Sequence, residues 1–347
     1  MNFVEKIAMF LSIYKLSFVH LYFYLILIIL NFSIIFLIKK ISLKYNFYDQ
    51  PNERKLHVRS TSYLGGIFFL FSHFFYLLFY QNYYFESHSL LLNSSNIFAF
   101  IVIPTLIFST GLIDDKVDLS PLKKSVILLI LISSALLIDG QIVIKSLDFE
   151  IIEKIFNLKD FSVIFTIICI YTFVNACNMF DGADLQIGLY FFIILIYLYF
   201  KSNYLHIFTP ILIPLFFFLF LNYKKICFIG NNGSHFLSYL LSIFIIKFYN
   251  LNILESVEEV VILMLIPGLD LIRLFFSRSL NKKPFFAPDL NHIHHLLLKK
   301  NSKSKVQMIL FFLNLSPIIV GEILGSYFFG IIYGTLFYFY LIFKKLK

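Results

Sequence analysis

Long apolar runs recur from one end of this chain to the other, and only short polar stretches separate them. A helix needs about 20 mostly apolar residues to cross the hydrocarbon core of a bilayer. This pattern predicts an all-α, polytopic membrane protein with about 11 transmembrane helices. The expected segments lie near residues 18–38, 64–80, 96–113, 125–139, 161–177, 185–200, 205–222, 235–249, 259–277, 306–321 and 324–343.

The composition supports one membrane domain over several soluble ones. Hydrophobic residues make up 59% of the chain, whereas soluble domains have about 45–50% apolar residues. The chain has 347 residues, which in a soluble protein would suggest about two or three domains. Because the apolar runs continue to the end, we expect a single membrane-embedded domain over residues 1–347.

The basic residues are concentrated in alternate loops. The formal net charge is +9, and a basic chain can bind nucleic acid, but this alternation is what membrane topology requires. The positive-inside rule places the basic loops in the cytoplasm, with the N-terminus outside and the C-terminus cytoplasmic. Nucleic acid is therefore not an expected partner. These loops span about 39–63, 114–124, 178–184, 223–234 and 278–305.

The first polar motif runs from Asp49 to His57, ahead of the glycine pair Gly65-Gly66. Lys55 and His57 near glycines suit a phosphate-bearing ligand that approaches the backbone closely. Taken alone, the loop is explained equally well as a basic anchor at the membrane surface.

Two adjacent carboxylates, Asp114 and Asp115, end the apolar segment 96–113. Ionised groups at this position are costly, which indicates a cation or another functional role. Lys123 and Lys124 follow at the start of the next segment and are placed to hold phosphate. A plain helix boundary accounts for the lysines but not for the paired aspartates.

Two further turns combine amides, carboxylates and glycines. Asn178, Asp181 and Asp184 follow an apolar segment, and such groups coordinate Mg²⁺ or hydrogen-bond a nucleoside. An ordinary turn rich in Asn, Asp and Gly is the alternative. The second turn, Gly230-Asn231-Asn232-Gly233-Ser234, precedes a helix and is a candidate anion-binding nest.

Three histidines, His292, His294 and His295, lie within four positions. A zinc site would need further ligands, and no cysteine completes one. The basic surroundings favour contacts with phosphate or sugar. All five motifs fall in the basic loops, so we expect them to meet in one pocket at the cytoplasmic face.

In this order and at these spacings, the motifs resemble the polyprenyl-phosphate N-acetylhexosamine-1-phosphate transferases. This superfamily, glycosyltransferase family 4, also includes the phospho-MurNAc-pentapeptide transferase. The resemblance covers roughly residues 45–300, and its strongest matches are Asp114-Asp115, Asn178 to Asp181, and His292-Ile-His294-His295. The histidine pattern is closer to the undecaprenyl-phosphate GlcNAc-1-phosphate transferase branch, because the peptidoglycan branch shows consecutive histidines.

The resemblance implies transfer of a sugar 1-phosphate, an N-acetylhexosamine, from a UDP-sugar to undecaprenyl phosphate, with release of UMP. This would be the first membrane step of an O-antigen (lipopolysaccharide) or other cell-surface polysaccharide pathway. The enzyme would lie in the bacterial cytoplasmic (inner) membrane with a cytoplasmic active site. The implied partners are the UDP-N-acetylhexosamine, undecaprenyl phosphate and the lipid bilayer, and a homodimer is compatible with them.

The resemblance also implies roles for individual residues. Asp114 or Asp115 would keep the attacking phosphate oxygen deprotonated. Mg²⁺, with Mn²⁺ as the alternative, would bridge the pyrophosphate, near Asn178 and Asn231. The expected nucleotide- and substrate-binding residues are Asn178, Asp181, Asp184, Lys55, Lys123, Lys124, His292, His294 and His295.

The glycine motif departs from the family pattern, which reads Gly-Asp-x-Gly-Ser with the aspartate as a magnesium ligand. Asn231 occupies that position here. An asparagine carbonyl still binds a hard cation, but it carries no charge, so we expect weaker Mg²⁺ binding.

Three alternatives stay open at this point. The chain could be a phospho-MurNAc-pentapeptide transferase, which the histidine pattern disfavours. It could be an inactive relative that binds lipid phosphate, for which Asn231 is the one supporting feature. A transporter is disfavoured because transporters carry polar groups near mid-membrane, whereas the charged groups here crowd one surface.

Overall fold

The computed structural model describes residues 18–50, 60–83, 98–202, 205–282, 284 and 290–346, and most of these are helical. Each expected apolar segment overlaps one long helix, which confirms the mainly helical prediction. The long helices are α2 (Phe18–Tyr45), α3 (Gly66–Tyr83), α5 (Ile103–Val117), α6 (Pro121–Ile138), α7 (Ser162–Phe180), α8 (Gln186–Ser202), α9 (Leu205–Tyr223), α10 (Gly230–Asn250), α11 (Val257–Leu280), α13 (Lys303–Leu324) and α14 (Tyr327–Leu346).

Among the described residues, 7 helices are long and apolar enough to cross a membrane, and three shorter apolar helices accompany them. The chain is therefore a helical, multi-pass membrane protein. The predicted number of about 11 crossings and the orientation of the termini stay predictions.

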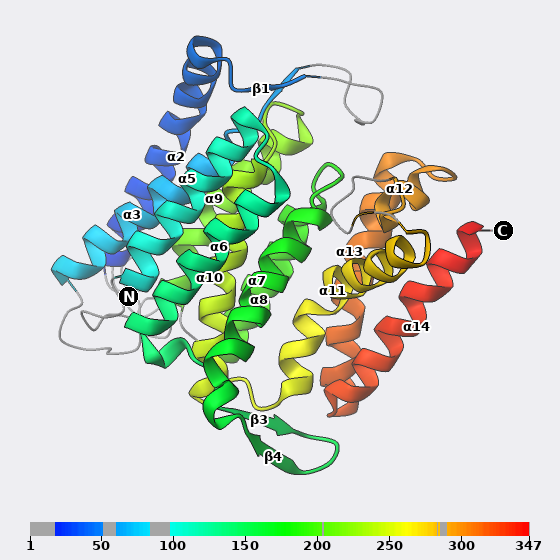
Figure 1. Cartoon of the computed structure of the whole chain (residues 1–347). Helices are drawn as coiled ribbons and strands as arrows, with labels where there is room; N and C mark the ends of the chain where they lie inside the picture. The colour runs from blue at the N-terminus through cyan, green and yellow to red at the C-terminus, as the bar shows by residue number, and fades with distance from the viewer. Residues whose placement is uncertain are drawn as a thin grey trace, which may run out of the picture.

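Helix α10 forms the centre of the bundle (Figure 1). It packs against α5, α7, α3 and α8 and is buried along most of its length. Its interior carries small polar residues, Ser234, Ser238 and Ser242, whose hydroxyls bond to backbone carbonyls of the preceding turn or to Asn178. Small side chains let helices approach closely inside a membrane bundle, so this helix can be less apolar than its neighbours.

One end of the bundle gathers the connections that hold the motifs. There β1 (Tyr48–Asp49) pairs antiparallel with β2 (Thr61–Ser62), and Ser62 forms a further bridge with Cys227. The Gly65 amide donates to the Phe228 carbonyl at 2.9 Å. These bonds fasten the start of α3 to the turn before α10. The short helix α12 (Ile293–Leu298) and the end of α14 lie at this same end (Figure 1).

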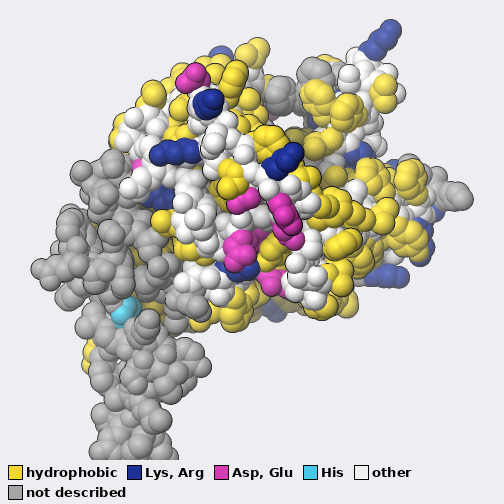
Figure 2. Space-filling view, turned by 90° about the horizontal axis from the view of Figure 1, so that it is seen from below, with side chains coloured by type: hydrophobic (Ala, Val, Ile, Leu, Met, Phe, Trp, Pro, Cys, Tyr) yellow, Lys and Arg dark blue, Asp and Glu magenta, His cyan; other side chains and the backbone are white. Residues whose placement is uncertain are grey.

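The opposite end carries a β-hairpin that the sequence analysis did not anticipate. Strands β3 (Ser146–Phe149) and β4 (Lys154–Asn157) pair antiparallel. The Glu258 carboxylate, at the start of α11, accepts hydrogen bonds from the Glu150 and Ile151 amides of the hairpin turn at 3.0 and 3.5 Å. Figure 2 views this end and shows acidic side chains gathered at its centre.

Candidate active site

A cavity of about 670 Å³ opens at the end opposite the hairpin and is lined by residues from every predicted motif. These turns were predicted to meet in one pocket, and the structure brings them together. The motif residues around the cavity are Asp49, Asp114, Asp115, Asp118, Asn178, Asp181, Asp184, Gly230, Asn231 and His295.

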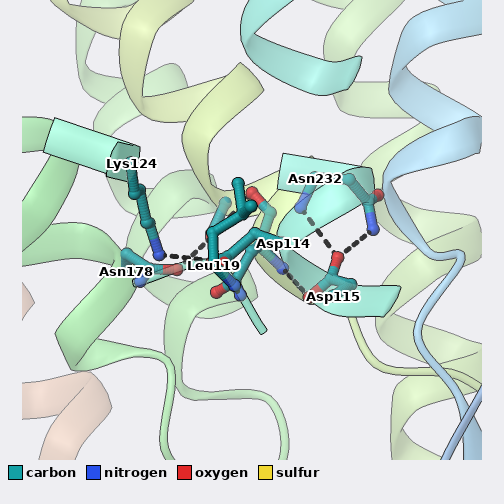
Figure 3. Close-up of polar contacts among 8 residues, drawn as sticks. Asp114, Asp115, Leu119, Lys124, Asn178 and Asn232 are labelled. Atoms are coloured by element: carbon teal, nitrogen blue, oxygen red, sulfur yellow. Dashed lines mark hydrogen bonds and ion pairs between the residues drawn. The ribbon is translucent and has the colours of Figure 1, made fainter. Parts of the chain in front are cut away.

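Asp115, on the last turn of α5, binds the start of α10. Its carboxylate accepts hydrogen bonds from the Asn231 amide at 2.9 Å, the Asn232 amide at 3.1 Å and the Asn232 side-chain Nδ2 at 2.7 Å (Figure 3). The first N–H groups of a helix have no partner within the helix and favour a negative charge. Asp115 satisfies two of them and thereby joins the two motifs.

The close packing of α5 on α10 depends on Gly111. A Cβ at this position would lie 2.6 Å from the backbone of Asn231 and Asn232. Any larger residue would force α5 away from the first turn of α10, and Asp115 sits one turn further along α5. The glycine therefore sets the distance between the paired aspartates and the glycine turn.

Asp114 is paired with a lysine that the sequence analysis had selected. Its Oδ2 lies 2.7 Å from Lys124 Nζ and also accepts from Asn231 Nδ2 at 2.8 Å, while Oδ1 accepts from the Leu119 amide at 3.0 Å (Figure 3). The aspartate is 7% exposed. Because a buried carboxylate is costly without a partner, the contacts with Lys124, Asn231 and Leu119 offset the cost of burying this side chain.

Asn231 makes a contact that the usual aspartate could not make. Its Nδ2 donates to Asp114 Oδ2, so the asparagine supplies a proton where an aspartate would place a second negative charge. Within the described part of the chain, its Oδ1 receives no hydrogen bond. Asn231 itself lines the cavity, so this carbonyl oxygen is a candidate ligand for a cation.

The turn after α7 carries an acid without a hydrogen-bond donor among the described residues. Asp181 follows the last residue of α7 and lines the cavity, and among the described residues its carboxylate has no hydrogen-bond donor. Burial, together with the negative charges of Asp115 and Asp184, raises the pKa of Asp181 to about 7. Asn178, one turn earlier, accepts a hydrogen bond from Ser234 Oγ at 2.9 Å.

The three histidines have different surroundings. His295 lines the cavity. His294 is 1% exposed, its ring nitrogens have no hydrogen-bond partner among the described residues, and burial holds its pKa well below the usual range. His292 turns the other way and places Nδ1 at 2.9 Å from Asp270 Oδ2. Of the three, His295 alone is among the residues that line the cavity.

The remaining predicted residues divide into three groups. Asp184 lines the cavity, and Lys123 is exposed and does not line it. Lys55 lies in 51–59, outside the described residues. The structure adds residues that the motifs did not reveal: Tyr63, Asn222, Lys303 and Gln307. Lys303 belongs to a basic loop, so its charge could have marked it as a site residue. Gln307 lies in an apolar segment, and nothing in the sequence there indicates a role in the site.

The oxygen-rich lining suits a hard divalent cation. No group of three His, Cys, Asp or Glu residues in the described ranges is already arranged around a metal position. Mg²⁺, however, is usually held by one or two protein carboxylates together with substrate phosphates and water. Asp181, which has no donor, and the carbonyl oxygens of Asn178 and Asn231 provide ligands of this kind. The residues present therefore fit the expected ion.

Comparison with known proteins bears on the same region. Residues 97–249 match the family model described as glycosyl transferase family 4. This region of the chain is similar to that family. The matched range includes α5, α7 and the glycine turn, and it holds 12 of the 19 residues that line the cavity.

The similarity to curated relatives extends over more of the chain. The chain is 27% identical over 289 residues to the probable undecaprenyl-phosphate N-acetylglucosaminyl 1-phosphate transferase of Bacillus subtilis (strain 168), covering 80% of this chain and 76% of the relative. The undecaprenyl-phosphate alpha-N-acetylglucosaminyl 1-phosphate transferases of Salmonella typhi and Escherichia coli (strain K12) are 25% and 24% identical, with the same coverage. The predicted family and branch are confirmed.

The raised pKa of Asp181 predicts a pH-dependent gain in stability when its charge is removed. The folded protein binds a proton at Asp181 up to about pH 7, whereas in the unfolded chain this carboxyl has its ordinary pKa of 3.8. Stability therefore falls as pH rises between these values. We expect Asp181→Asn to raise the free energy of unfolding at pH 8 by about 2 kcal/mol, below the full conversion of the shift because the cavity is open.

Thermal unfolding of the purified protein at pH 5 and pH 8 measures this effect. The difference in Tm between the variant and the wild type should be large at pH 8 and small at pH 5. Asp160→Asn, on the exposed 3-10 turn η3 (Lys159–Phe161) at the hairpin end, is the matched control. An equal difference at both pH values would contradict the assignment.

Proposed function

We propose that this glycosyltransferase transfers an N-acetylhexosamine 1-phosphate from a UDP-sugar to undecaprenyl phosphate and releases UMP. The observation that carries the proposal is the convergence of the predicted motifs on one cavity at the end of a membrane helix bundle. The names of the relatives support the lipid acceptor and the sugar class. The first membrane step of a cell-surface polysaccharide pathway is the corresponding cellular role.

The reaction requires that two clusters of phosphate charge be aligned and neutralised. An oxygen of the lipid phosphate bonds to the phosphorus next to the sugar, the bond from that phosphorus to the bridging oxygen breaks, and UMP leaves with the electron pair. Lys124 and Lys303 supply positive charge at the cavity. Asp114 and Asp115 keep the attacking phosphate oxygen deprotonated.

When bound, Mg²⁺ would neutralise the pyrophosphate of the donor. The residues that would hold it are Asp181, Asn178 and Asn231, with substrate oxygens completing the shell. His295 lines the cavity and would contact phosphate or sugar. Asp184, in the turn after α7, lines the same cavity.

The charge distribution supports a cytoplasmic site. The cavity end carries loop lysines such as Lys44, Lys116, Lys224 and Lys299, whereas the hairpin end carries acidic residues such as Glu150 and Glu255. By the positive-inside rule, the cavity end faces the cytoplasm of the bacterial inner membrane. The N-terminus would then be outside, and the chain forms one membrane-embedded domain.

A transfer assay in membranes tests the function. Membranes that contain the protein are incubated with undecaprenyl phosphate, Mg²⁺ and a panel of radiolabelled UDP-N-acetylhexosamines. Label should pass to a lipid-extractable product with at least one donor, and UMP should appear in equal amount. If no donor yields labelled lipid while UDP-sugar binding is also absent, the transferase proposal fails.

Asn231→Asp is expected to lower the Mg²⁺ concentration that gives half-maximal activity by roughly tenfold, because it adds a charged ligand at the metal position. Without Mg²⁺ the same change replaces a donor to Asp114 with a second carboxylate at about the present 2.8 Å contact. We therefore also expect a lower Tm in metal-free buffer.

Titration of activity and of Tm with Mg²⁺ measures both effects. Asn252→Asp, an exposed position of positive φ at the hairpin end, makes the same chemical change away from the cavity. A Mg²⁺ requirement that is the same in wild type and Asn231→Asp would contradict a metal-binding role for this position.

A further inference from the structure

A buried carboxylate that was not among the predicted site residues contacts the histidine motif. Asp270, on α11, is 2% exposed. Its Oδ2 lies 2.9 Å from His292 Nδ1, and its Oδ1 accepts from the Ile293 amide at 3.2 Å. Asp270 therefore holds both the first histidine of the motif and the first N–H of helix α12.

Two further donors bind the same carboxylate. Arg273 Nη2 lies 2.7 Å from Asp270 Oδ1, and the Tyr338 hydroxyl donates to the same oxygen at 2.7 Å. Arg273 Nε in turn donates to the Tyr338 oxygen at 2.7 Å. Four donors thus converge on one buried acid, which fixes its position closely.

Tyr338 brings the C-terminal helix into this arrangement. It lies on α14, is fully buried, and comes from a helix beyond the residues 97–249 that match the family model. Helix α14 packs against α11, α12 and α13. The Tyr338 hydroxyl therefore connects α14 to Asp270.

Helix α12 depends on such an anchor because it has only 6 residues, and helices this short are not stable alone. The three histidine rings contact one another in series. His292, which binds Asp270, stacks on His294 with ring centroids 5.5 Å apart, and His294 contacts His295 with centroids 4.2 Å apart. These ring contacts connect Asp270 to His295, which lines the cavity.

We propose that Tyr338 and Arg273, acting through Asp270, are positioning residues that hold helix α12 so that His295 faces the cavity. The catalytic consequence rests on the proposed function. The positioning itself concerns only this chain and is measurable without turnover.

Chemical modification of the histidines tests the positioning directly. Full-length protein in membranes is treated with diethyl pyrocarbonate, and the rate at each histidine of the motif is followed by mass spectrometry. In Tyr338→Phe, the rates at His292 and His294 should rise about tenfold, because one hydrogen bond to a charged group is lost. Asp270→Asn should act in the same direction. Tyr340→Phe is the control, since Tyr340 is exposed on the same helix and its hydroxyl contacts Lys344.

Kinetics then separate positioning from general destabilisation. With activity normalised to folded protein, Tyr338→Phe should lower kcat about tenfold and leave KM for the UDP-sugar within about twofold, since the contacts of His295 with phosphate strengthen in the transition state. Unchanged modification rates in both Tyr338→Phe and Asp270→Asn would overturn the inference, as would a normal kcat in both. If the wild type transfers no sugar, the proposed function fails, and the modification rates still decide the positioning.

Discussion

Replacing either Asp114 or Asp115 with asparagine is expected to lower turnover about 1000-fold or more, while the protein still folds and inserts. Removal of one preorganised electrostatic contact in a buried site costs about 10²–10³-fold in rate, and each of these acids makes several contacts. In Asp115→Asn, the new amide nitrogen meets N–H donors of the first turn of α10. In Asp114→Asn, Lys124 loses its partner.

The transfer assay at saturating donor measures this loss, with size-exclusion profiles and Tm values to show that each variant is folded. Asp160→Asn, the same change on the surface of the hairpin end, should keep full activity. Near-normal turnover in both Asp114→Asn and Asp115→Asn would defeat the roles assigned to the pair.

The two variants should also differ from each other. Asp115 joins α5 to α10 through backbone amides, so its replacement should lower Tm. Asp114 is bound mainly by side chains, Lys124 and Asn231, and its replacement should affect turnover with a smaller change in Tm. A larger loss of Tm in Asp115→Asn than in Asp114→Asn would distinguish the role of Asp115 in joining α5 to α10 from the electrostatic role of Asp114.

Much of the bundle could be predicted because a membrane helix must be apolar over a known length. The expected segments overlap the long helices, and the motifs lie at the same end because basic loops alternate along the chain. The hairpin Ser146–Asn157 was not predicted, since its residues show no strict alternation and its turn is fixed by Glu258, a residue distant in sequence.

The individual contacts within the site depend on pairs far apart in sequence. Nothing in residues 290–298 indicates that His292 turns toward Asp270 and away from the cavity, or that Tyr338 holds that acid. Likewise, Asn231 was expected only to weaken a metal site, and its hydrogen bond to Asp114 follows from how α10 meets α5. Motif composition predicts which groups gather, whereas helix packing determines which of them face the substrate.

Gly182→Ala is expected to lower turnover about 100-fold and to destabilise the protein, because the added Cβ would lie 2.0 Å from the His294 ring. His294 is buried and cannot move into solvent, so either the turn that carries Asp181 or helix α12 must shift, and overpacking of this kind costs about 1–3 kcal/mol. Gly140→Ala, where a Cβ meets nothing within 4 Å, should leave activity and Tm unchanged.

The decisive measurement is Tm in a His294→Ala background. The loss of Tm caused by Gly182→Ala should largely disappear once the His294 ring is removed, since the two changes share one contact. If Gly182→Ala lowers Tm by the same amount with and without the His294 ring, the contact between Gly182 and His294 is contradicted.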